Sequence, residues 1–110
     1  SDGLITLLKR GINLVDIRRE EEWRKTGVIA GSKLMTAFDQ NGRVVPGFPD
    51  TFSSLFGKDE EVILICHSRG RSSFLARVLV EQLDHKNVFN VTNGIISWMK
   101  DGKPVISNEQ

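Results

Sequence analysis

The segment EVILICHSRGRSSFLARVLVEQL, residues 61–83, decides the expected fold of this chain. Its first part, residues 61–66, is almost entirely apolar, which is typical of a buried strand. Residues 72–83 have a helical pattern, with one apolar stripe that consists of Phe74, Leu75, Val78, Leu79 and Leu83. A short polar loop joins the two parts, and Cys66, the only cysteine, stands where the strand ends. The segment therefore predicts a strand, a tight loop and a helix.

The same alternation of strands and helices continues on both sides of this segment. We expect further strands at 12–17, near 33–36 and at 87–91, and helices at 3–10, 19–27, 49–57 and 94–101. The main irregular loop is expected at 38–49, and the helix at 49–57 should begin on Asp50 or Thr51 and end at Gly57. The strands are apolar throughout, so the pattern predicts an α/β fold whose parallel sheet is covered on both faces.

Length and composition limit the classes of protein that fit. A chain of 110 residues suits one domain, residues 1–110. The net charge of +1 argues against a nucleic-acid partner. No run approaches the ~18 apolar residues of a membrane span, so membrane insertion is not expected. No signal peptide is visible, but the chain begins with Ser1 rather than Met, as after processing or trimming. The sequence therefore indicates a soluble protein and leaves the cytoplasm and the periplasm both open.

The loop from Cys66 to Ser72 has the composition of an anion-binding turn. Backbone N–H groups of a tight strand-to-helix loop point inward, and the positive end of the helix dipole adds to them. His67, Arg69 and Arg71 contribute basic character, and Gly70 permits unusual backbone angles. Such surroundings stabilise a thiolate and attract an anionic substrate. Cys66 could instead be an inert core thiol, but the basic loop directly after it favours a nucleophile.

Four blocks of the sequence resemble the rhodanese family of thiosulfate sulfurtransferases. They are LVDIRREEEW (14–23), TGVIAGS (26–32), ILICHSRGRSS (63–73) and VFNVTNGIISWMKDGKPV (88–105). The chain departs from the family where Val28 replaces a usual histidine, Asn93 a common glycine and Trp23 a frequent tyrosine or phenylalanine. Val28 and Asn93 leave efficient turnover of thiosulfate less certain than persulfide formation. The Asp-Ile-Arg, Glu-Trp and Thr-Gly pairs resemble those of exported bacterial single-domain members.

The resemblance implies a rhodanese-like α/β/α fold of three layers, with a mostly parallel central sheet of about five strands. It implies that Cys66 attacks a small anionic donor such as thiosulfate, becomes a persulfide, and passes the sulfur to a thiol or a protein cysteine. This double displacement needs no cofactor. The expected substrate-binding residues are His67, Ser68, Arg69, Gly70, Arg71 and Ser72. Asp16, Arg18 and Glu22 are expected to form a supporting network.

Two alternatives remain beside sulfur transfer. One is a cysteine phosphatase or arsenate reductase on a related fold, and the other is a non-catalytic sulfur carrier or interaction module. Cysteine phosphatases place five residues between cysteine and arginine. Here four residues separate Cys66 from Arg71, and Ser72 stands where a phosphatase needs its arginine. The smaller loop favours a persulfide over a phosphoryl group, whose oxygens need more donors.

The remaining polar and aromatic residues carry several expectations. Asp16 and Cys66 should lie at the same rim, because both end parallel strands. Arg71 is expected either to bind substrate or to brace the loop against an acid such as Asp16. His67 could donate to an anion, act as a general base or face solvent. His85 is expected to be exposed, and Trp98 to lie in the core. No metal site is expected, because the cysteine and the two histidines lack ligand spacing.

Overall fold

The structure is a computed structural model that describes residues 2–67, 71–91 and 94–107. Its helices are α1 (Asp2–Lys9), α2 (Glu20–Thr26), α3 (Phe48–Leu55), α4 (Arg71–Leu83) and α5 (Gly94–Lys100). Its strands are β1 (Asn13–Asp16), β2 (Lys33–Leu34), β3 (Val62–Ile65) and β4 (Val88–Asn90). The predicted α/β alternation is therefore confirmed.

The strands form one parallel sheet in the order β2-β1-β3-β4. The expectation of about five strands is corrected to four in the described part of the chain. A further backbone pairing joins Val28 and Ile106, but it is antiparallel and spans one residue pair. Strand β2 ends at Leu34, although a strand was expected near 33–36, because the residues after it no longer pair regularly with β1. The N–H groups of Met35 and Ala37 still donate to the carbonyls of β1 and the residue after it.

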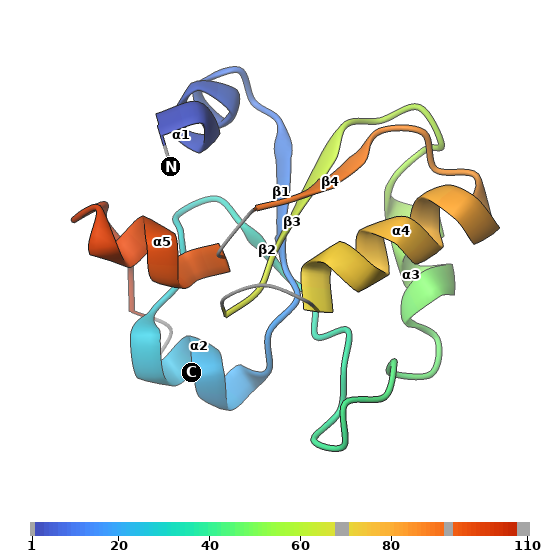
Figure 1. Cartoon of the computed structure of the whole chain (residues 1–110), viewed down its shortest axis with the longest axis horizontal. Helices are drawn as coiled ribbons and strands as arrows, with labels where there is room; N and C mark the ends of the chain where they lie inside the picture. The colour runs from blue at the N-terminus through green and yellow to red at the C-terminus, as the bar shows by residue number, and fades with distance from the viewer. Residues whose placement is uncertain (1, 68–70, 92–93, 108–110) are drawn as a thin grey trace.

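The sheet is buried on both faces, which explains its uniformly apolar strands. Val15, Val62 and Leu64 face one core, which also contains the three phenylalanines of the α3 region and the inner side of α4. Leu14 and Ile63 face the other core, beneath α1 and α5. Figure 1 shows the two pairs of helices on opposite sides of the sheet, with α2 beyond the end of β1. The predicted three-layer arrangement is confirmed.

Three local expectations about the helices are wrong. Helix α3 does not begin on Asp50 or Thr51, because the left-handed Gly47 is its N-cap and Pro49 occupies the first turn. It ends at Leu55, before the expected stop at Gly57. Phe74 of α4 does not lie in the core stripe, since its side chain is 51% exposed and rests against Phe38 with ring centroids 6.4 Å apart.

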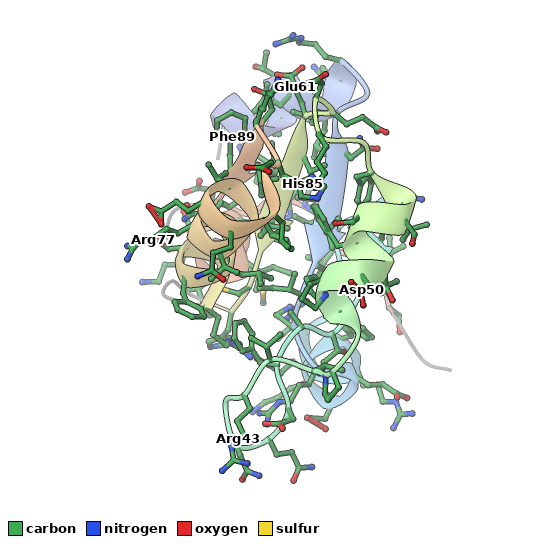
Figure 2. All side chains as sticks on the ribbon, turned by 90° about the vertical axis from the view of Figure 1, so that its right-hand side faces the viewer. Arg43, Asp50, Glu61, Arg77, His85 and Phe89 are labelled. Carbon is green, nitrogen blue, oxygen red and sulfur yellow. The ribbon has the colours of Figure 1, made fainter. Side chains whose placement is uncertain are left out.

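His85 is buried, so the expectation that it is exposed is wrong. Its Nε2 lies 2.9 Å from Ser53 Oγ, and its ring meets Phe52 edge-on. Figure 2 shows His85 between α3 and α4. Burial, and then the charge of Lys58, lower the pKa of His85, and the backbone of Gly57 opposes this only in part. The imidazole therefore joins two helices in its neutral form.

Trp98 lies in the core as predicted, and its indole Nε1 donates to the carbonyl of Pro104 at 2.8 Å. This bond ties α5 to the segment that pairs with Val28. Among the described helices, none is long and apolar enough to cross a membrane.

Candidate active site

Cys66 and Asp16 lie at the same rim of the sheet, as predicted. Strands β1 and β3 run parallel, and Asp16 pairs in register with Ile65, the residue before the cysteine. Figure 1 shows the two chain segments leaving the sheet at one end, where α2 and the start of α4 also lie. In open parallel sheets this is the end at which ligands bind. Residues from four elements therefore meet around Cys66.

The thiol of Cys66 is enclosed and has a defined hydrogen-bond partner. The residue is only 1% exposed, and its Sγ–H donates to Ser72 Oγ at 3.4 Å. Ser72 is itself fully buried in the first turn of α4. The backbone is fixed as well, because the N–H groups of Ile95 and Ile96 donate to the carbonyls of Cys66 and His67 at 2.9 and 3.0 Å. The beginnings of two helices thus hold the end of β3.

Arg71 is braced by Glu22 rather than by Asp16. Its Nη1 and Nη2 donate to the two carboxylate oxygens of Glu22 at 3.2 and 3.1 Å, the fork geometry that guanidinium groups favour. The backbone N–H of Arg19 also donates to Glu22, at 3.2 Å. A glutamate three residues after a helix N-cap is a recognised sequence signal, and it could have identified this contact.

Two opposing effects act on the carboxyl group of Glu22. Burial is the largest single effect and would raise its pKa, but the hydrogen bonds from Arg71 and from the Arg19 backbone act in the opposite direction. The positive charges of Arg71 and Arg18 act in the same direction, so the pKa of Glu22 lies below its usual value. Glu22 is therefore a carboxylate at neutral pH.

Asp16 and Arg18 form a separate, fully enclosed ion pair. Arg18 donates to Asp16 through Nε at 3.0 and 3.1 Å and through Nη2 at 2.8 Å, and both side chains are at most 1% exposed. The other bonds of the guanidinium go to Thr26 Oγ1 at 2.7 Å and to the carbonyl of Gly27 at 2.9 Å. Sequence reasoning missed these last two partners. The pair ties β1 to the end of α2, and neither side chain is accessible to solvent.

His67 is the most accessible of the described site residues. Its side chain is 48% exposed, and Nδ1 lies 3.9 Å from Oε2 of Glu22. Val28, where a histidine is usual, is 5% exposed and packs inside the protein. Ser68, Arg69, Gly70 and Asn93 lie outside the described residues. The structure thus brings Cys66, His67, Arg71, Ser72 and Glu22 together through the Cys66–Ser72, His67–Glu22 and Arg71–Glu22 contacts, whereas Asp16 and Arg18 form their own pair.

Comparisons with known proteins concern the family of this chain. A family model for the rhodanese-like domain matches residues 2–101. The mitochondrial protein HIGH ARSENIC CONTENT 1 of Arabidopsis thaliana is 33% identical over 98 residues, covering 86% of this chain and 57% of that protein. The chain therefore spans little more than half of that relative. A sulfurtransferase of Allochromatium vinosum is 35% identical over 52 residues, covering 47% of this chain and 48% of that protein.

Solved structures share the fold at lower identity. The rhodanese-like domain of an Anabaena sp. protein superposes with a TM-score of 0.76 at 18% identity, covering 97% of this chain and 76% of that one. A Rhodopseudomonas palustris protein of unknown function, described as a possible tyrosine phosphatase, has a TM-score of 0.70 at 24% identity, covering 94% and 79%. The family match and the Allochromatium relative support a family of the sulfur-transfer type. The site geometry and the match over nearly the whole chain together show that this protein belongs to the rhodanese-like domain family.

Proposed function

We propose that the protein is a thiosulfate sulfurtransferase that carries sulfane sulfur on Cys66. The observation that carries the proposal is the position of this thiol. It lies at the carboxyl end of a buried strand, against Ser72 in the first turn of α4. Thiolate nucleophiles are favoured beside a helix N-terminus, where backbone N–H groups and the dipole stabilise negative charge. Four residues link Cys66 to Arg71, the first residue of α4.

In the first step, the thiolate of Cys66 attacks the outer sulfur of thiosulfate. A new sulfur–sulfur bond forms on Cys66, the sulfur–sulfur bond of thiosulfate breaks, and sulfite leaves with the electron pair. Backbone N–H groups of the loop from His67 to Ser72 stabilise the persulfide anion. A thiol or a protein cysteine then removes the outer sulfur, and cyanide does so in an assay. No cofactor takes part in either step.

Two features favour sulfur over phosphorus at this site. Ser72 occupies the position in which a phosphatase needs its arginine, and it is buried against the thiol. Arg71, one residue earlier, has two of its donors committed to Glu22. A phosphoryl group would have to compete with that carboxylate for the guanidinium. We therefore expect negligible phosphatase activity.

Mass spectrometry of the intact protein tests the proposal. Thiosulfate should add one sulfur atom to the protein, cyanide or dithiothreitol should remove it, and Cys66→Ser should prevent the addition. Because the chain has one cysteine, a persulfide mass that persists in Cys66→Ser would refute the assignment. A parallel assay with an aryl phosphate addresses the rival activity. Cys66-dependent release of phosphate without sulfur transfer would assign the chain to the phosphatases instead. An intact protein that takes sulfur neither from thiosulfate nor from inorganic polysulfide would support the non-catalytic alternative.

A further inference from the structure

His67 has a fixed backbone and an accessible ring directly beside the nucleophile. Its carbonyl accepts the N–H of Ile96 at 3.0 Å, which anchors the residue to α5. Its side chain is half exposed, whereas the neighbouring Cys66 is enclosed. The imidazole of His67 is therefore open to a molecule from solvent, one residue along the chain from the enclosed Cys66.

The carboxylate of Glu22 lies near this ring. The Nδ1 atom of His67 lies 3.9 Å from Oε2 of Glu22, within ion-pair range although beyond a hydrogen bond. Glu22 is held in turn by the two bonds from Arg71, so the carboxylate is a rigid reference point. A carboxylate beside Nδ1 favours the tautomer that carries its proton there. That tautomer leaves the lone pair of Nε2 free to accept a proton.

The charges around the ring distinguish between the roles available to His67. Glu22 of α2 is the acidic group beside the ring, and the same carboxylate oxygen also contacts the guanidinium of Arg71 on α4. An anion placed against Nδ1 would be repelled by this carboxylate. A neutral thiol would not be repelled. The surroundings thus favour a proton acceptor over an anion-binding group.

Building on the sulfur transfer proposed above, we propose that His67 is the general base of the second half-reaction and that the acceptor is an alkyl thiol. Nε2 removes the proton of the acceptor thiol, and the acceptor sulfur forms a bond to the outer sulfur of the Cys66 persulfide. The bond between the two sulfurs on Cys66 breaks, and its electron pair leaves Cys66 as a thiolate. The acceptor becomes a persulfide, and the imidazolium returns its proton to solvent.

An alkyl thiol needs this assistance and an acidic aryl thiol does not. With a free thiol pKa near 8.5, only a few per cent of an alkyl thiol is thiolate at pH 7, whereas 4-nitrothiophenol is already ionised. General-base catalysis typically contributes about 10²–10⁴-fold to a rate. Loss of the base should therefore slow transfer to the alkyl thiol selectively.

The test measures single-turnover discharge of a preformed persulfide. Cys66 is loaded with inorganic polysulfide, and the outer sulfur is then removed with either 2-mercaptoethanol or 4-nitrothiophenol. His67→Gln should slow discharge to 2-mercaptoethanol about 100-fold and discharge to 4-nitrothiophenol less than about threefold. Lys86→Gln, an exposed substitution that precedes β4, serves as the matched control. Equal losses with the two acceptors would overturn the proposal, because a merely structural role affects both alike.

A pH series and a second variant supply independent readouts. In His67→Gln, discharge to 2-mercaptoethanol should rise about tenfold per pH unit toward the pKa of the acceptor, since only free thiolate then reacts. In His67→Ala, added imidazole should restore part of the lost rate, and a rate unaffected by imidazole would count against a proton-transfer role.

The loading of Cys66 by thiosulfate is measured in a separate experiment. If polysulfide loads Cys66 and thiosulfate does not, the proposed donor is wrong while the discharge test stands. If neither loads it, both proposals are wrong.

Discussion

Removing the carboxylate of Asp16 should destabilise the protein far more than removing an exposed carboxylate. Asp16→Asn keeps the size of the side chain but leaves the guanidinium of Arg18 without a counter-charge. Arg18 is 0% exposed, so solvent cannot replace the lost charge. An arginine also cannot escape the cost by losing its proton.

The magnitude follows from the hydrogen bonds of this pair. Three Arg18–Asp16 contacts, at 2.8 to 3.1 Å, join the two side chains, and the amide oxygen of asparagine can replace only part of them. The bonds to Thr26 and Gly27 remain, but both partners are neutral. Breaking a buried pair by removing one partner typically costs about 3–5 kcal/mol. Because asparagine keeps one acceptor, we expect about 3 kcal/mol, which corresponds to a thermal midpoint lower by about 12 °C.

Urea unfolding of Asp16→Asn measures this cost, with two companion variants. Glu20→Gln removes a carboxylate from the exposed pair with Arg24 and should change the free energy of unfolding by less than about 0.5 kcal/mol. Asp16→Leu combined with Arg18→Met removes both charges and should recover at least half of the loss. A cost below about 1 kcal/mol for Asp16→Asn would refute the argument. The argument would also be refuted if the double variant lost as much stability as the summed losses of Asp16→Leu and Arg18→Met, each measured alone.

Two further predictions concern Gly27 and His85. Gly27 has φ 82° and ψ −177°, and a Cβ there would meet the carbonyl oxygen of Ile106 at 2.6 Å, so Gly27→Ala should cost about 2–4 kcal/mol in urea unfolding. Gly31→Ala, also at positive φ but with open space around it, should cost only about 1 kcal/mol, and equal costs would contradict the close contact. Burial lowers the pKa of His85, so the unfolded chain binds its proton first as the pH falls below 6.5, and stability declines with falling pH. Between pH 7.5 and 5.5 the wild type should lose up to about 1 kcal/mol more than His85→Gln, whereas parallel pH profiles would show that His85 does not titrate differently on folding.

The amino-acid pattern was sufficient for the type and order of the elements and for the position of Cys66 at the end of a buried strand. Apolar runs such as 61–66 have no polar face, so they fit only a sheet covered on both sides. Parallel pairing then places the residue after each strand at one rim, which is why Asp16 and Cys66 could be expected together. These features depend on local periodicity, which the sequence contains, and on pairing rules that hold for all parallel sheets.

Only the tertiary structure decided which charged and aromatic groups meet. Glu22 and Arg71 are 49 residues apart in the chain, and Arg71 could equally have paired with Asp16 by sequence alone. Arg18, two residues from Asp16, already occupies that carboxylate, and Arg71 pairs instead with Glu22 of α2. In the same way, α3 packs over His85 and buries it, whereas Phe74 projects beyond the core stripe toward Phe38. A local pattern records how apolar a residue is, but its partners depend on elements that folding brings beside it from distant parts of the chain.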